Sequence, residues 1–185
     1  MKSNLTKKIL AYGLRTVLIA SAAIAPAPNV TYVGAWNTNL NYPARLASAP
    51  DGGIYVTDPP SNQVIHYNSL GVWQHTYPIP EGPVGIAVHD DVDDGRVFVS
   101  RNDGKIGVYP AGFAGSPSFV NPAPRVLTGP NDLAFHPGAN ELYAVDAGGH
   151  QVLVFREISG IWTLNRAWGL EGSQASEFES PQAIA

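Results

Sequence analysis

Residues 130–155 read Pro-Asn-Asp-Leu-Ala-Phe-His-Pro-Gly-Ala-Asn-Glu-Leu-Tyr-Ala-Val-Asp-Ala-Gly-Gly-His-Gln-Val-Leu-Val-Phe. Three short apolar runs stand out in this stretch, at 130–134, 142–146 and 151–155, and turn residues such as Pro, Gly and Asn separate them. Short runs rich in Val, Leu and aromatic residues, bounded by such turns, predict β-strands. This stretch therefore predicts three consecutive strands.

The same pattern occurs twice earlier in the chain and begins again at its end. Its opening proline recurs at Pro43, Pro83, Pro130 and Pro181, so the openings lie 40, 47 and 51 residues apart. Self-similarity at about 40–50 residues, with several short strands per unit, is typical of β-propeller blades. The 19 glycines and 16 prolines of the 185 residues supply frequent turns, and the predicted fold class is all-β. The second strands of the earlier units are 54–58 and 97–101, and the third strands are 63–67 and 105–109.

The repeated order is Pro-x-x-Ile/Leu-Ala, a turn, aromatic-Val-x-Asp, and then a polar residue before Val/Ile-x-x-aromatic. This order resembles the NHL repeat, and the resemblance covers roughly residues 42–185. It implies an NHL-type β-propeller with about three and a half four-stranded blades of a ring that is expected to be six-bladed. NHL propellers are known as binding platforms and some relatives are enzymes, so the repeat does not select a function. The expected blades are 42–81, 82–128 and 129–179, with the start of the next at 180–185.

The second unit departs from the other two. It carries Arg101 where the others carry Asp58 and Asp146. In those two units we predict that the aspartate is hydrogen-bonded across the hairpin to Gln63 and Gln151, respectively.

The second unit also contains a longer connection. Residues 110–124 are rich in Pro, Gly, Ala and Ser and account for the 47-residue spacing. One outer strand is expected around 118–120. A tolerated surface insertion is the favoured interpretation, and a functional lid is the alternative.

The first 25 residues have the pattern of a secretory signal peptide. Four basic residues precede the apolar stretch 16–25, which is shorter than the 20 or so residues that span a bilayer. We therefore expect an exported, periplasmic or extracellular protein with no membrane span after signal removal. The absence of cysteine excludes disulfides and thiolate sites.

Residues 26–41 are expected to supply an N-terminal outer strand that closes the ring. The sequence stops inside the first strand of a blade, so we expect the front part of a longer protein. In this form, apolar residues of the third unit, including Leu133 and Leu142, are expected to lie on faces that missing blades would cover. Self-association is the predicted consequence.

Beyond residue 25 the chain has seven basic residues against all 15 acidic ones, a net charge of −8. Nucleic-acid binding requires clustered Lys and Arg that neutralise phosphates. The sequence therefore argues against a nucleic-acid partner.

Four aspartates cluster at positions 90–94, on the turn between the first two strands of the second unit. Asp91, Asp93 and Asp94 offer carboxylate oxygens of the kind that calcium prefers. In an EF-hand loop that begins at Asp91, the twelfth position, which needs a bidentate acid, is occupied by Asn102. A solvated turn is the favoured interpretation and a weak calcium site the alternative, and no other cofactor is predicted.

His89 and His136 occupy the same repeat position, directly after the first strand. Propeller-type amidating lyases hold zinc with histidines near the central channel. Here no third histidine stands at a matching depth, so structural roles at turns are favoured. The four tryptophans lie on outer-strand segments, and packing between blades is predicted for them.

The starts of the innermost strands face the axis of a propeller. Arg45, Asn131 and Asp132 are therefore the predicted contact residues at the mouth of the channel. Asn131-Asp132 also resembles a segment of the substrate pocket in gluconolactonase-like propellers. The favoured function is a non-enzymatic module that binds a protein or a glycan. The alternative is a metal-dependent enzyme, gluconolactonase-like or amidating-lyase-like.

Overall fold

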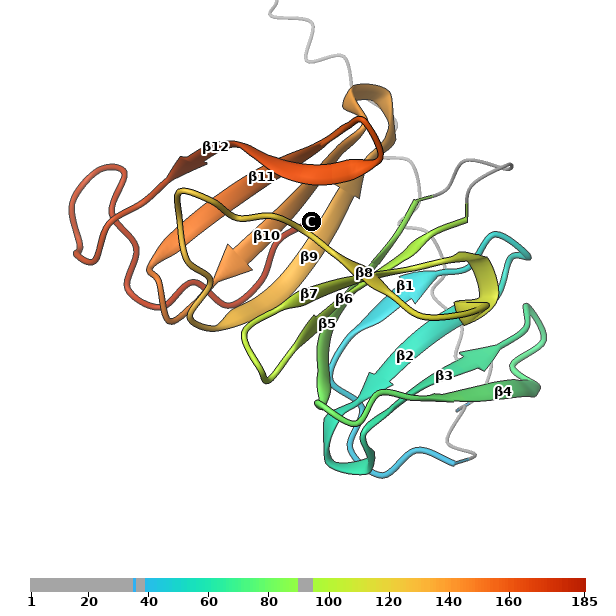
Figure 1. Cartoon of the computed structure of the whole chain (residues 1–185). Helices are drawn as coiled ribbons and strands as arrows, with labels where there is room; N and C mark the ends of the chain where they lie inside the picture. Colours follow the sequence, from blue (N-terminus) through green and yellow to red (C-terminus); the bar gives the residue numbers. More distant parts are fainter. Residues whose placement is uncertain (1–34, 36–38, 90–94) are drawn as a thin grey trace, which may run out of the picture. The chain divides into compact units, whose positions relative to one another are not determined.

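The structure is a computed structural model that describes residue 35 and residues 39–89 and 95–185. The strands in these residues form three four-stranded antiparallel sheets, within the unit Trp36–Ala185 (Figure 1). The first blade contains β1 (Leu46–Ser48), β2 (Ile54–Asp58), β3 (Gln63–Tyr67) and β4 (Trp73–Pro78). The second contains β5 (Pro83–Val88), β6 (Val97–Arg101), β7 (Ile106–Tyr109) and β8 (Ser118–Phe119). The third contains β9 (Pro130–His136), β10 (Glu141–Asp146), β11 (Gln151–Ile158) and β12 (Ile161–Trp168).

Each sheet follows chain order from its first strand to its fourth, which is the arrangement of a propeller blade. The first strands lie next to one another, with β5 in contact with both β1 and β9 (Figure 1). The three sheets lie within the ranges expected from the repeat. Short 3₁₀ turns occur at η1 (Pro59–Ser61), η2 (Ala111–Phe113) and η3 (Pro137–Ala139).

Two inner strands differ from the sequence prediction. The strand predicted from Pro43 begins at Leu46, although the Ala44 amide and the Arg45 carbonyl still bond to the Thr57 main chain. Residues 181–185 form no strand. The Gln182 carbonyl and the Ile184 amide bond to the side chains of Arg45, Asn131 and Asp132 instead of to a neighbouring main chain. The predicted closing strand at 26–41 lies almost entirely outside the described residues.

The main apolar core lies between the second and third blades. Phe98 of β6 meets the Trp162 ring of β12 edge-on, with 5.0 Å between ring centroids. Leu133 and Leu142 are buried in the same cluster. The prediction that these two leucines face missing blades is therefore wrong. Side chains alternate between the two faces of a strand, and Leu133 and Leu142 lie on the face that packs against the second blade.

A second core fills the space between the first and second blades. Its buried members come from both sheets, including Tyr55 and Val64 of the first and Val97, Val99 and Tyr109 of the second. Packing of successive blades on each other is how repeat architectures bury a continuous core.

The predicted Asp–Gln hydrogen bonds are confirmed. Gln63 Nε2 donates to Asp58 Oδ2 at 3.3 Å, and Gln151 Nε2 donates to Asp146 Oδ2 at 2.9 Å. Both aspartates are fully buried. Each also accepts backbone N–H groups of the segment that enters its blade, as seen in the 2.6 Å bond from Gly129 to Asp146.

Burial alone would raise the pKa of Asp58. Hydrogen bonds from the backbone amides of Asn41 and Tyr42, together with those from the Ser61 and Gln63 side chains, outweigh burial and lower that pKa below its usual value. The aspartate therefore remains ionised and fixes the entering segment to the blade.

No helix in the part of the chain that the structure describes combines the length and the hydrophobicity needed to cross a membrane.

Candidate functional site

The predicted channel-mouth residues lie together. Arg45 precedes β1, whereas Asn131 and Asp132 belong to β9, and the Arg45 guanidinium forms an ion pair with Asp132 (Nε to Oδ1, 3.3 Å). Arg45 Nη2 and Asn131 Nδ2 each donate to the Gln182 carbonyl at 2.9 Å. Asp132 Oδ2 accepts from the Ile184 amide at 3.1 Å. The first and third blades thus converge on one extended segment.

This arrangement has a definite recognition chemistry. Donors on Arg45 and Asn131 meet a main-chain carbonyl, and a carboxylate on Asp132 meets a main-chain N–H. Such a set matches the alternating acceptors and donors of an extended peptide. A cavity of 200 Å³ adjoins it, next to Asn131 and Gln182.

His89 and His136, which share a repeat position, both contact the η3 turn. His136 Nδ1 accepts the Ala139 amide at 3.1 Å and so caps η3. His89 Nε2 lies 3.2 Å from Asn140 Oδ1, and its ring packs on Phe135 with 4.3 Å between centroids. Within residues 39–89 and 95–185, no three His, Asp or Glu side chains are grouped so as to hold a metal ion. The calcium candidates Asp91, Asp93 and Asp94 lie outside the described residues.

The tryptophans divide into two kinds. Trp162 is buried between blades, as predicted. Trp73 and Trp168 are 42% and 40% exposed, so the packing prediction is wrong for these two. They lie on β4 and β12, the outermost strands of their sheets, which have a neighbouring strand on one side only. Trp36 lies outside the described residues.

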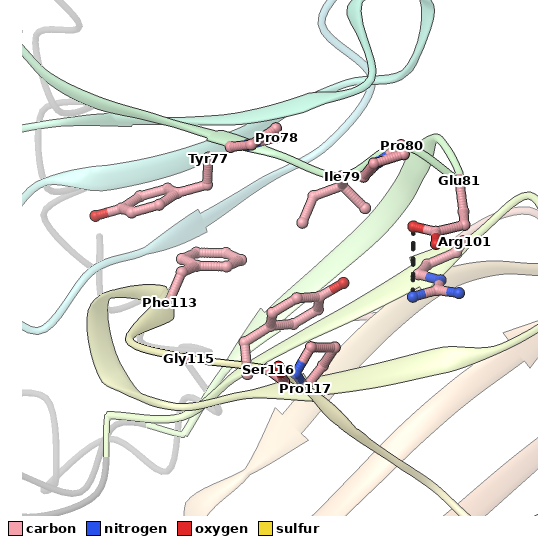
Figure 2. A pocket seen from close by; sticks show the side chains of 11 residues that line it. Tyr77, Pro78, Ile79, Pro80, Glu81, Arg101, Phe113, Gly115, Ser116 and Pro117 are labelled. Atoms are coloured by element: carbon pink, nitrogen blue, oxygen red, sulfur yellow. Dashed lines mark ion pairs between the residues drawn. The ribbon is translucent and has the colours of Figure 1, made fainter.

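A second site, which the sequence did not predict, lies between the first and second blades. It is a cavity of 360 Å³ beside the connection from β4 to β5 (Figure 2). Its lining comes from the end of β4 and that connection, from the ends of β6 and β7, and from the loop after β7. The residues are Tyr77, Pro78, Ile79, Pro80, Glu81, Arg101, Tyr109, Phe113, Gly115, Ser116 and Pro117.

One side of this cavity is aromatic. The Phe113 ring stacks on Tyr77, with centroids 4.3 Å apart and planes 20° apart (Figure 2). Its centroid also lies 4.9 Å from that of the Tyr109 ring. Phe113 has a φ of 56°, in the left-handed region that bulky residues seldom adopt. This strained backbone is maintained where it places the ring against the two tyrosines.

The Tyr109 ring packs directly over Gly107, which has no side chain. A Cβ atom at position 107 would lie 2.7 Å from Tyr109 Cε2, so the tyrosine ring covers the glycine. Burial raises the pKa of Tyr109, and the neighbouring Arg101 guanidinium opposes that rise. The phenol is therefore neutral and can act as a hydrogen-bond donor.

The other end of the cavity is charged. Arg101 is a buried cation, with 6% of its side chain exposed, and its Nη1 lies 3.5 Å from Glu81 Oε2 (Figure 2). Its Nε donates to Asp103 Oδ1 at 3.1 Å. The hydrogen bond to Asp103 raises the pKa of Arg101, and in return lowers the pKa of Asp103. Lys105 Nζ lies 3.9 Å from Asp103, so two cations face two carboxylates.

Comparison with known proteins supports the fold alone. No family model and no curated protein matches the chain. Among solved structures, the chain is similar to hydrazine synthase of Kuenenia stuttgartiensis (TM-score 0.60, 16% identity, 84% of this chain and 41% of that chain). It is also similar to virginiamycin B lyase of Staphylococcus aureus (TM-score 0.57, 18% identity, 78% of this chain and 45% of that chain). A chain of a nidogen/laminin complex matches with a TM-score of 0.54 and 15% identity, over 70% of this chain and 52% of that chain.

These similarities support the assignment of the three sheets as propeller blades. The chain spans about half the length, or less, of the structures it matches. Because enzymes and a protein taken from a complex share the architecture, function must be argued from the sites.

Proposed function

We propose that this chain is part of an exported, non-enzymatic propeller module of the NHL-repeat type that binds a partner protein at the mouth of its channel. One observation carries the proposal. Arg45, Asn131 and Asp132 come from two different blades, and each of them makes a hydrogen bond to the main chain of residues 182–184. An extended segment of a partner has the same groups to offer.

The charge of the module agrees with this role. Beyond residue 25 the chain is acidic, which disfavours nucleic acid, and Arg45 is a cation at the mouth. The Asn131-Asp132 pair that resembles a gluconolactonase-like pocket is engaged by Arg45 and residues 182–184. The enzymatic alternative stays a prediction without an observation in its favour.

The test is selection of peptides from a displayed random library on the purified chain, followed by fluorescence anisotropy. Selected peptides are expected to bind at least tenfold more weakly to an Arg45→Ala/Asn131→Ala double variant, a loss of about 1.4 kcal/mol. Lys105→Ala removes an exposed cation away from the mouth and serves as the matched control. Peptides that bind the double variant as well as the original chain would show that the mouth is not the contact site.

A further inference from the structure

The three blades are copies of one pattern, so a position where only one copy differs needs its own explanation. Position 107 is Gly, whereas Ile65 and Leu153 pair at the same register in the first and third blades. Arg101 replaces the buried aspartate, and residues 110–117 belong to a connection that is longer than its counterpart in the first blade. All three departures converge on the 360 Å³ cavity between the first two blades.

Each departure contributes a different part of the cavity. Gly107 leaves the space over which Tyr109 lies, Arg101 supplies a buried cation at one end, and the loop supplies Phe113. The loop holds Phe113 in a left-handed conformation, which is strained for a bulky residue. Ile or Leu at position 107 would displace the Tyr109 ring from the place where it lines the cavity.

We propose that this cavity is a binding site for a neutral saccharide, separate from the channel mouth. Its volume is within the range of about 300–1,000 Å³ found for small-molecule sites. Tyr77, Tyr109 and Phe113 present apolar ring surface on one side, which suits the C–H face of a pyranose. Glu81 and Arg101 at the other end offer an acceptor beside a donor, which suits neighbouring sugar hydroxyls.

The charge balance selects an uncharged ligand. Arg101 and Lys105 face Glu81 and Asp103, so the cluster carries no net charge. An anionic sugar would lie against Glu81 and a cationic sugar against Arg101, and neither finds an unpaired opposite charge. Neutral hydroxyls, in contrast, can add to the Glu81–Arg101 pair without breaking it.

A proline-rich peptide is the rival occupant, since aromatic grooves also bind such peptides. Prolines offer carbonyl acceptors but no N–H donors. A prolyl segment could accept a hydrogen bond from Arg101, but it has no N–H to donate to the Glu81 carboxylate. A sugar hydroxyl donates and accepts, so a saccharide satisfies both ends. The geometry therefore favours the saccharide.

Saturation-transfer NMR and calorimetry with the full chain test this proposal. The probes are the neutral disaccharides cellobiose, maltose, lactose and N,N′-diacetylchitobiose, with a diuronic acid, chitosan disaccharide and a proline decapeptide as comparators. At least one neutral disaccharide is expected to bind with a Kd near or below about 1 mM, and the charged comparators at least tenfold more weakly. Phe113→Ala and Glu81→Gln are each expected to weaken that binding tenfold or more.

Two variants separate this site from others. Trp73→Ala removes an exposed aromatic ring outside the cavity, and Arg45→Ala/Asn131→Ala disables the channel mouth; both are expected to leave saccharide binding unchanged. Glu81→Gln alters an exposed side chain and keeps its shape, so a loss of binding with an unchanged thermal melt supports the site. The proposal is overturned if no neutral disaccharide binds at about 10 mM. It is equally overturned if binding survives both cavity substitutions, or if the proline decapeptide binds there in place of the sugars.

Discussion

Asp146→Ala should strongly destabilise the third blade. The buried carboxylate accepts the Gly129 amide at 2.6 Å and Gln151 Nε2 at 2.9 Å, and the Thr128 amide lies 3.2 Å from each of its oxygens. Hydrogen bonds to a charged group contribute about 1.5–3 kcal/mol each, so losing the two short ones lowers the free energy of unfolding by about 3–6 kcal/mol. That is a large share of the about 5–15 kcal/mol that stabilises a typical domain.

Urea denaturation followed by tyrosine and tryptophan fluorescence measures this loss, as a lower midpoint at an unchanged m-value. Asp146→Asn keeps one acceptor oxygen and should cost less, about 1–3 kcal/mol. Glu179→Ala removes an exposed carboxylate and should change stability by less than about 0.5 kcal/mol. If Asp146→Ala cost less than about 1 kcal/mol, the claim that this aspartate fixes the entering segment would fail.

Four further outcomes are expected. Mass spectrometry of the protein from its native host should find a processed N-terminus between residues 23 and 30, and retention of Met1 would contradict export. Calcium titration should reveal no site tighter than about 10⁻⁴ M, and a tighter site lost in Asp91→Asn/Asp93→Asn would overturn the solvated-turn interpretation. The Arg166 guanidinium lowers the pKa of Glu141 from 4.5 to about 2, so the stability it contributes is present above pH 4.5 and should fall as the pH drops toward about 2, unlike in Glu141→Gln. Light scattering on the chain without its first 27 residues should show self-association, and a single monomeric species with a cooperative melt would contradict it.

Most of the fold could be predicted because the strands are short, apolar and repeated. The strands predicted at 54–58, 63–67 and 97–101 have the same bounds in the structure. The aspartate–glutamine bonds could also be predicted, since both residues flank one hairpin and their separation is local. Which blade an apolar face packs on was harder to predict. Leu133 and Leu142 show why, because alternation along a strand places residues on two faces without identifying the neighbour of each.

The two sites differ in how far the sequence could predict them. Arg45 and Asp132 share one repeat position near the channel and Asn131 is adjacent to it, so knowing the architecture was enough to bring the three together. The aromatic cavity has no such shared position. Tyr77, Arg101 and Phe113 come from different blades and from a loop, and only the packed structure places them around one space. The signal in the sequence was indirect and lay in the departures of the second unit from the other two.

Those departures also change how the second blade holds its entering segment. In the first and third blades a buried aspartate accepts backbone N–H groups of the entering segment. Arg101 has no acceptor and cannot do this. Instead the Asn102 amide donates to the Gly82 carbonyl at 3.0 Å, while Arg101 turns to Asp103 and Glu81. The entering segment of the second blade is thus held by the backbone bonds of Asn102 to Glu81 and Gly82 and by the Arg101–Glu81 ion pair, in place of bonds to a buried aspartate. The one copy of the repeat that exchanges this aspartate for a cation is also the copy that forms the cavity, which is the pattern expected when a local departure from the repeat serves a binding site.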